Sequence, residues 1–90
     1  MTDMTITNTF EVLKTYFIVK ERENFSIVKV IVAEYRTKDC IKRGKETFAT
    51  VNILRQEYPD DKFIINTITA PTFDLPLTLD KSLIEYRVIA

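Results

Sequence analysis

The chain has 90 residues, of which 46% are hydrophobic and 29% are charged, and thirteen basic residues balance thirteen acidic ones. These values are typical of a globular domain, exclude a chain that is disordered throughout, and argue against a nucleic-acid binder that acts through bulk positive charge. We predict a single domain over residues 1–90, with residues 1–8 frayed. No apolar run is long enough to span a bilayer and the N-terminus has no signal-peptide pattern. We therefore expect a cytoplasmic protein with no membrane partner.

Two strands are predicted in the first part of the chain. β-Branched and aromatic residues dominate from Phe10 to Lys20, which indicates the first strand. Residues 21–24 form a polar break of hairpin-loop length, in which we expect Asn24 to adopt a positive φ. The second strand runs from Phe25 to Arg36 and is apolar on both faces in its middle. This pattern is typical of a central strand covered on both sides, and a strand covered by one helix and by a partner chain would show the same pattern.

A helix is predicted from Lys38 to Glu57, with Thr37 as the N-cap and Asp39 in the first turn. Gly44 lies within its apolar stripe, which indicates close approach of the helix to the sheet. Ile53 lies off the stripe and is expected to be exposed or to touch a loop. The predicted stripe consists of Cys40, Ile41, Gly44, Phe48, Val51, Leu54 and Tyr58.

Pro59 ends the helix because it cannot continue the hydrogen-bond ladder. A third strand is predicted over residues 62–69, an extended segment over 70–80 and a last strand over 82–90. The predicted fold is α+β, an antiparallel sheet of about four strands with one helix packed on a face, in the order β-β-α-β-loop-β.

The residue types available limit the chemistry of the chain. Histidine is absent, and there is one cysteine and one glycine, so the commonest general base, a thiolate metal cage and a Gly-rich phosphate loop are missing. We therefore predict a protein that is not an enzyme and has no cofactor or metal. The adjacent acids Asp60 and Asp61 are interpreted as a solvated turn rather than a cation site. Cys40, near the helix start, is interpreted as a small buried hydrophobe rather than a reactive thiol.

The segment from residue 70 to 80 is the first candidate surface. Its large apolar residues recur at every second position, which predicts one apolar face, and Pro76 limits the segment to an edge position. The segment either covers the core or forms an exposed patch that binds a protein. In the second case nearby acids could imitate phosphates. The candidate partner-binding residues are Phe73, Leu75, Leu77, Leu79, Asp60, Asp61 and Asp74.

The basic start of the helix is the second candidate surface. Three lysines fall on one helix face and an arginine lies beside it, where positive charge opposes the helix dipole. This cluster is either a solvated face or a contact for an anionic partner such as nucleic acid. Its residues are Lys38, Lys42, Arg43 and Lys45.

Charge is also segregated along the chain. Residues 29–45 hold six basic and two acidic side chains, whereas residues 57–85 hold six acidic and two basic ones. The predicted function is a non-enzymatic protein-binding module, of the kind found among inhibitors and accessory proteins of phages and mobile elements, that occludes a larger partner. Its partner is another protein, or a second copy in a homodimer. The alternative is a nucleic-acid-binding domain that uses the basic helix start.

Overall fold

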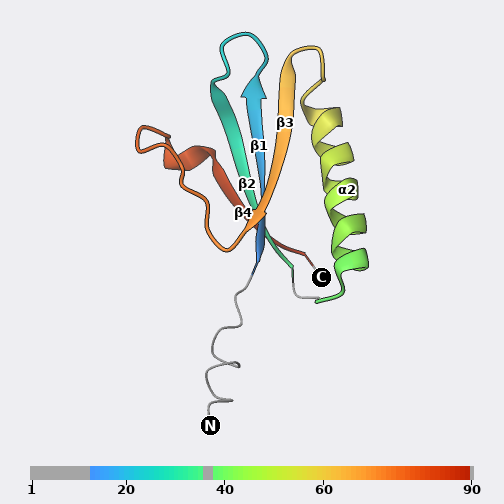
Figure 1. Ribbon diagram of the computed structural model, residues 1–90. Coiled ribbons are helices and arrows are strands. Elements are labelled where there is room, and N and C mark those ends of the chain that lie inside the picture. The colour runs from blue at the N-terminus through green and yellow to red at the C-terminus, as the bar shows by residue number, and fades with distance from the viewer. Residues whose placement is uncertain (1–12, 36–37, 90) are drawn as a thin grey trace.

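The computed structural model describes residues 13–35 and 38–89 of the chain, so the predictions for residues 1–8, for 10–12 and for Thr37 as N-cap lie outside the described residues. The predicted α+β fold and its order of elements are confirmed (Figure 1). The elements are β1 (Lys14–Glu21), β2 (Ile27–Tyr35), α2 (Cys40–Glu57), β3 (Phe63–Ala70), the 3-10 helix η1 (Lys81–Leu83) and β4 (Ile84–Ile89).

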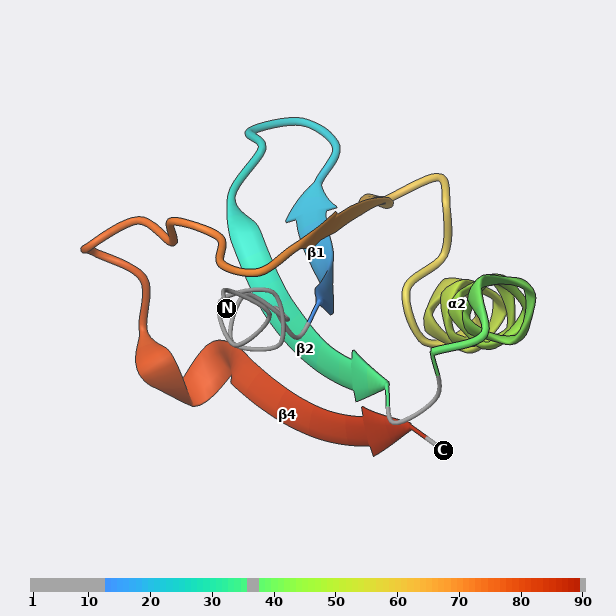
Figure 2. The same ribbon diagram turned by 60° about the horizontal axis from the view of Figure 1, so that its bottom comes forward.

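The four strands form one mixed sheet in the order β3-β1-β2-β4. β1 pairs antiparallel with β2 and with β3, whereas β4 pairs parallel with β2. The sheet therefore differs from the all-antiparallel expectation at its last strand. The reason is the connection between β3 and β4, which crosses the sheet to the opposite edge (Figures 1 and 2). A tight hairpin would enforce antiparallel pairing, but a long crossover delivers a strand in the parallel direction.

The hairpin between β1 and β2 closes differently from the prediction. The residue with positive φ is Phe25, at 57°, and not Asn24. The Asn24 side chain instead accepts a hydrogen bond from the backbone N–H of Ser26 at 3.1 Å, and the Phe25 N–H donates to the Glu21 carbonyl at 2.9 Å. A left-handed conformation costs about 1–2 kcal/mol for a residue with a side chain. The loop geometry thus overrides the local preference of an aromatic residue.

The core has one cluster on each face of the sheet, because β2 is central and buried on both sides, as predicted. On the side of α2, Leu54 contacts a cluster of strand residues that includes Phe17, which is fully buried. Burying a side chain of this size contributes about 1.5–3 kcal/mol. The buried members of this cluster are Phe17, Ile31, Ala33, Tyr35 and Leu54.

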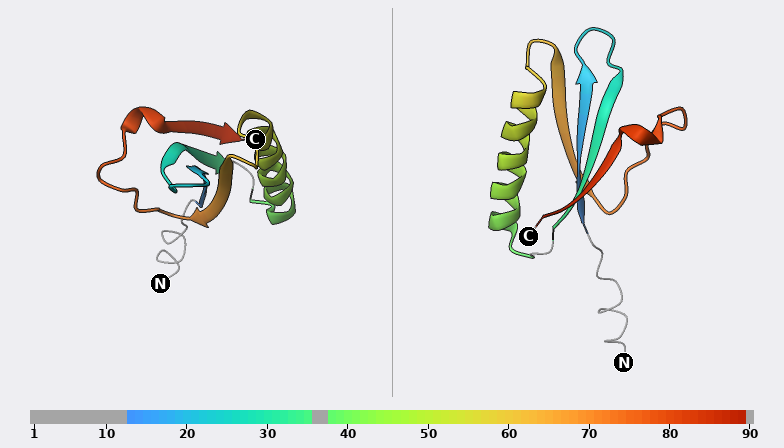
Figure 3. Two further views of the ribbon diagram at one scale, coloured as in Figure 1. Left: turned by 90° about the horizontal axis from the view of Figure 1, so that it is seen from above. Right: turned by 180° about the vertical axis from the view of Figure 1, so that it is seen from behind.

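The opposite face of the sheet is covered by the segment between β3 and η1. Tyr16, Val30 and Val32 are buried there, and the segment folds back across them (Figure 3). Its apolar side chains take the place that a second helix occupies in a three-layer fold. The partly buried residues that this segment contributes are Phe73, Leu75 and Leu79.

Candidate functional site

Helix α2 begins later than predicted, because Asp39 is its N-cap. The Asp39 carboxylate accepts hydrogen bonds from the backbone N–H groups of Ile41 at 2.9 Å and Lys42 at 3.3 Å. This cap satisfies two of the free donors at the helix start and places a negative charge where the helix dipole favours one. Lys38 therefore precedes the helix instead of forming its first turn.

Only the C-terminal half of α2 is packed in the core. Its buried residues are Thr50 and Leu54, and Val51 and Tyr58 pack partly against the same cluster. Tyr58 also contacts Phe63 edge-on, with ring centroids 5.3 Å apart. This half of the helix is therefore the structural anchor that holds α2 beside β3 (Figure 1).

The N-terminal half of α2 carries exposed apolar side chains, which corrects the predicted stripe. Ile41 is 69% exposed and Phe48 is 67% exposed, and Cys40 is exposed as well, so none of the three is the buried residue expected. Ile41 and Phe48 are separated by two helical turns and share one side of the helix. Ile53, predicted to lie off the stripe, is 49% exposed.

Gly44 lies between Ile41 and Phe48 and does not mark a close approach. A Cβ atom built on Gly44 would meet no other atom within 4 Å. The glycine therefore widens the space beside the helix instead of allowing the sheet to come nearer. The predicted reason for this glycine is wrong.

A groove of about 550 Å³ runs between α2, from Cys40 to Arg55, and the end of the sheet at which β1 begins and β2 and β3 end. The wall opposite the helix is formed by Thr15, Tyr35 and Thr69 of the sheet and by Leu13, which directly precedes β1. The helix wall includes Arg43, Gly44, Thr47, Phe48, Val51 and Arg55.

The hydroxyl groups of the groove hydrogen-bond to one another. Thr15 and Thr69 lie 3.0 Å apart between their Oγ1 atoms, and the Tyr35 hydroxyl lies 2.6 Å from the Thr47 Oγ1. The groove is thus an apolar surface whose neutral polar groups already have partners.

Within residues 13–35 and 38–89, the charged side chains that line the groove are two arginines. Arg43 is half-buried, and Arg55 makes a loose ion pair with Asp60, with 3.7 Å between Nε and Oδ1. Among the residues that the structure describes, no acidic side chain belongs to the groove lining. Each of these guanidinium groups can orient a carboxylate or a phosphate by paired hydrogen bonds.

Of the predicted basic cluster, Arg43 lines the groove, while Lys42 and Lys45 are exposed on the solvent side of α2. Lys45 lies on the helix surface between Ile41 and Phe48. Basic and apolar side chains therefore lie together on one exposed surface of the helix. The sequence did not predict this combination, because the apolar residues were assigned to a buried stripe.

The candidate apolar residues of the crossing segment are divided between two environments. Phe73 contacts Tyr16, with ring centroids 5.5 Å apart, and Leu75 and Leu79 also pack on the sheet. Leu77 alone of the four is fully exposed, because a turn closed by the Leu79 N–H and the Pro76 carbonyl carries it away from the sheet. The segment lies across a sheet face, so Phe73, Leu75 and Leu79 follow the first of the two predicted alternatives, a cover of the core, and the segment does not pair as an edge strand.

The acidic candidates do not form one site. Asp60 and Asp61 lie in the turn between α2 and β3, where the Arg22 guanidinium donates to the Asp60 carbonyl at 3.0 Å. Asp74 lies in the crossing segment, which covers the face of the sheet opposite α2. Asp80 caps η1 by accepting from the Ser82 N–H at 2.9 Å, and this hydrogen bond lowers the pKa of its carboxyl group.

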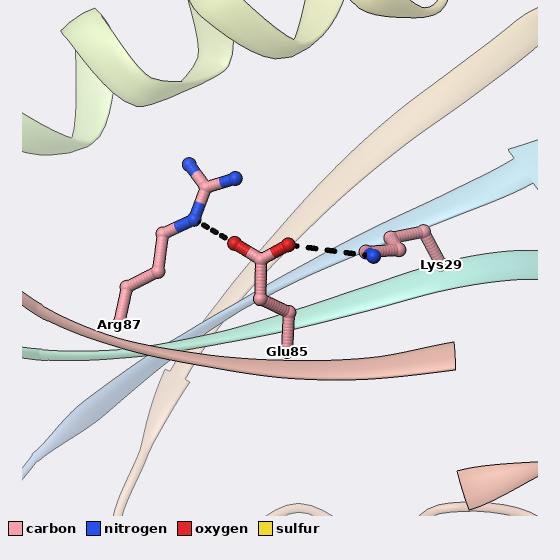
Figure 4. Close-up of polar contacts among 3 residues, drawn as sticks. All are labelled: Lys29, Glu85 and Arg87. Carbon is pink, nitrogen blue, oxygen red and sulfur yellow. Dashed lines mark hydrogen bonds and ion pairs between the residues drawn. The ribbon is translucent and has the colours of Figure 1, made fainter. Parts of the chain in front are cut away.

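A polar cluster that was not predicted from the sequence lies on β2 and β4. Glu85 bonds to the Arg87 guanidinium and lies 3.3 Å from the Lys29 ammonium, and all three side chains are on the α2 side of the sheet (Figure 4). The hydrogen bond from Arg87, together with the charges of Arg87 and Lys29, holds the pKa of Glu85 below its usual value. The alternation of Glu85 and Arg87 with apolar residues is the sequence pattern from which a charged face of this strand could have been predicted.

The other side of β4 is apolar and open. Tyr86 is 75% exposed and Val88 is 60% exposed. β4 is also an edge of the sheet, where it pairs with β2 on one side. This strand is therefore a second surface at which apolar side chains meet solvent.

Within the part of the chain that the structure describes, no group of three or more cysteine, aspartate or glutamate side chains could hold a metal ion. Over the same ranges no helix is both long enough and apolar enough to cross a membrane. Comparison of the chain with models of protein families, with curated proteins and with solved structures finds no match in any of the three.

Proposed function

We propose that this chain is a protein-binding module that performs no catalysis and receives a segment of a partner protein in the groove beside α2. The observation that carries the proposal is the exposure of Ile41 and Phe48 next to an apolar groove. Large hydrophobic side chains that gather at a groove are typical of protein interfaces. The absence of histidine from the sequence supports the non-catalytic part of the proposal.

The charges beside the groove select the chemistry of the occupant. Among the described residues, Arg43 and Arg55 line it and no acid does, and Lys45 is exposed one helical turn from Phe48. The segment that fits has an aromatic or aliphatic anchor flanked by aspartate or glutamate. Burying the anchor supplies affinity, and the paired arginine contacts fix its orientation. An accessory protein or inhibitor of phage or mobile-element type could cover the working surface of a larger partner in this way.

The test is a selection of displayed peptides against the immobilised protein, with the Phe48→Asp variant as the counter-target. Enriched peptides should combine an apolar anchor with acidic neighbours, and their affinity should fall at least tenfold on Phe48→Asp. Ile53→Asp is the matched control, because it adds the same charge to an exposed hydrophobe on a different side of the same helix. Selection of basic peptides, or equal loss of binding in both variants, would contradict the proposal.

A second function, binding of single-stranded nucleic acid, is favoured by one observation. Phe48 is exposed one helical turn from Lys45 and lines the same groove as Arg43, and an aromatic ring among cations is the usual platform on which bases stack. The same surface could thus meet a phosphate backbone. The test is fluorescence anisotropy with a labelled single-stranded oligonucleotide, because such binding falls steeply with salt. It should weaken on Lys42→Glu and Lys45→Glu, and a lack of binding at low salt would leave the protein-binding function alone.

A further inference from the structure

Strand β4 is an edge strand with little protection. It is six residues long, contains no proline, and exposes Tyr86 and Val88 on one face. Among the described elements β2 is the strand that pairs with it, and its other edge faces away from the sheet (Figures 2 and 3). Natural proteins usually protect such an edge, because its free N–H and C=O groups accept another strand.

The sequence of β4 is self-complementary about Tyr86. Reading outward from this tyrosine in both directions gives one acid and one base, Glu85 and Arg87, and then two aliphatic residues, Ile84 and Val88. We propose that a second copy of the chain pairs with β4 in the antiparallel direction, with the two Tyr86 residues opposite each other on a two-fold axis.

The charges on the α2 side of the sheet favour this register over its neighbours. In the proposed pairing Glu85 lies opposite Arg87 of the second copy, and Arg87 lies opposite its Glu85. A pairing centred on Glu85 would place two glutamates opposite each other, and one centred on Arg87 would place two arginines opposite each other. Opposite-charge pairs across strands stabilise a sheet and like-charge pairs destabilise it.

On the face of the sheet opposite α2, the proposed pairing brings apolar side chains of the two β4 strands together. There Ile84 lies opposite Val88 of the second copy, and the two Tyr86 rings meet at the centre. Tyr86 and Val88 are the exposed hydrophobes of this strand, so the pairing covers the apolar surface that β4 leaves in solvent. The two sheets would join into one of eight strands, with both copies of α2 on the same side, since a two-fold axis normal to the sheet preserves its faces.

The opposite edge of the sheet, formed by β3, has no charges that would favour one pairing register over another. β3 carries no charged residue between Phe63 and Ala70, so no charge would fix a register there. β3 also has α2 beside it (Figure 1). The self-pairing proposal is independent of the groove, because it uses β4 and none of the groove residues.

The test measures the oligomeric state of the full chain by sedimentation velocity over a range of protein concentrations. The unchanged protein should dimerise, Glu85→Arg and Arg87→Glu should each shift the dimer to monomer by at least tenfold in dissociation constant, and the double variant Glu85→Arg/Arg87→Glu should restore it. The restoration separates cross-strand pairing from the loss of the Lys29 contact, which the double variant also lacks. A monomer at all concentrations, or a dimer that ignores both single changes, would overturn the proposal.

A cysteine cross-link tests the register even if a charge variant fails to fold. In a Cys40→Ser background, Tyr86→Cys should give a disulfide-linked dimer on mild oxidation, because directly opposite residues lie about 4.5–5.5 Å apart between Cα atoms. Val88→Cys is the matched control. The two Val88 positions would be displaced along the strands by about 13 Å, at about 3.3 Å per residue, which is beyond disulfide reach. Equal cross-linking of both variants would refute the Tyr86 register.

Discussion

The two halves of α2 contain a similar share of apolar residues, yet the apolar side chains of the two halves differ in how much of their surface is exposed. The C-terminal half places Leu54 in the core with no exposed surface, whereas the N-terminal half leaves Ile41 and Phe48 mostly in solvent. Leu54 belongs to the cluster around Phe17, whereas Phe48 and Gly44 line the groove, where a Cβ on Gly44 would meet no other atom within 4 Å. A hydrophobic stripe thus identifies a helix, but part of such a stripe can be binding surface.

The largest test of this comparison is truncation of one large side chain in each half. Leu54→Ala should destabilise the domain by about 2–5 kcal/mol, because it leaves a cavity in the cluster around Phe17. Phe48→Ala should change stability by less than about 1 kcal/mol, as for other exposed positions. Urea unfolding followed by circular dichroism measures both. Similar losses in the two variants would show that the N-terminal half is also part of the core.

The crossing segment on the opposite face offers the same comparison. Phe73→Ala should cost about 1–3 kcal/mol, because it removes a ring that packs on Tyr16 and covers the second cluster. Leu77→Ala should stay within about 0.5 kcal/mol, since Leu77 is fully exposed. The same urea titration compares the two. If Leu77→Ala cost as much as Phe73→Ala, the turn at Pro76 would have to be packed in solution.

Gly44→Ala tests the same comparison with a substitution that should raise the free energy of unfolding. Alanine should stabilise the domain by about 0.5–1 kcal/mol, because it raises helix propensity and its Cβ meets nothing within 4 Å. The midpoint of thermal unfolding should therefore rise. The control is Ala49→Gly, which should lower it by a similar amount at an exposed position of the same helix. A destabilised Gly44→Ala variant would restore the idea of close approach to the sheet.

The smallest expected effect concerns the ion cluster on β4. The pKa of Glu85 is lowered in the folded state, first by the hydrogen bond from Arg87, so its contribution is complete above the usual value of 4.5 and is lost as the pH falls through the lowered pKa. The stability difference between the protein and Glu85→Gln should therefore shrink on acidification. Urea titrations at neutral and acidic pH, at a protein concentration that keeps the chain monomeric, measure it. A difference that stays constant with pH would contradict the ionic contribution.

Much of the fold could be predicted from local pattern. The runs of β-branched residues, the polar break after Lys20 and the stop at Pro59 place the elements to within a few residues of their observed ends. The N-cap of α2 and the conformation of the hairpin turn were harder to predict from the sequence. Asp39 and the neighbouring Thr37 are both good caps, and Phe25 takes a backbone conformation that its residue type disfavours.

The candidate sites were less predictable, because burial depends on where an element sits as well as on its own pattern. Phe48 belongs to an apolar stripe and is exposed, and Phe73 belongs to an apparent surface segment and packs against Tyr16. The oppositely charged halves of the sequence meet in part, since Lys29 from the basic segment pairs with Glu85 from the acidic one.

The sequence by itself determined the class of the fold, an α+β arrangement with central β2 and one helix after it, and the lack of histidine and of a Gly-rich phosphate-binding loop. These features follow from residue type and period, which act over a few neighbouring positions. The tertiary structure alone decided that β4 is parallel and forms an edge, that half of α2 stands open over a groove, and that residues 71–80 cover the second face of the sheet. These features depend on contacts between segments distant in sequence, whose energies no local pattern contains.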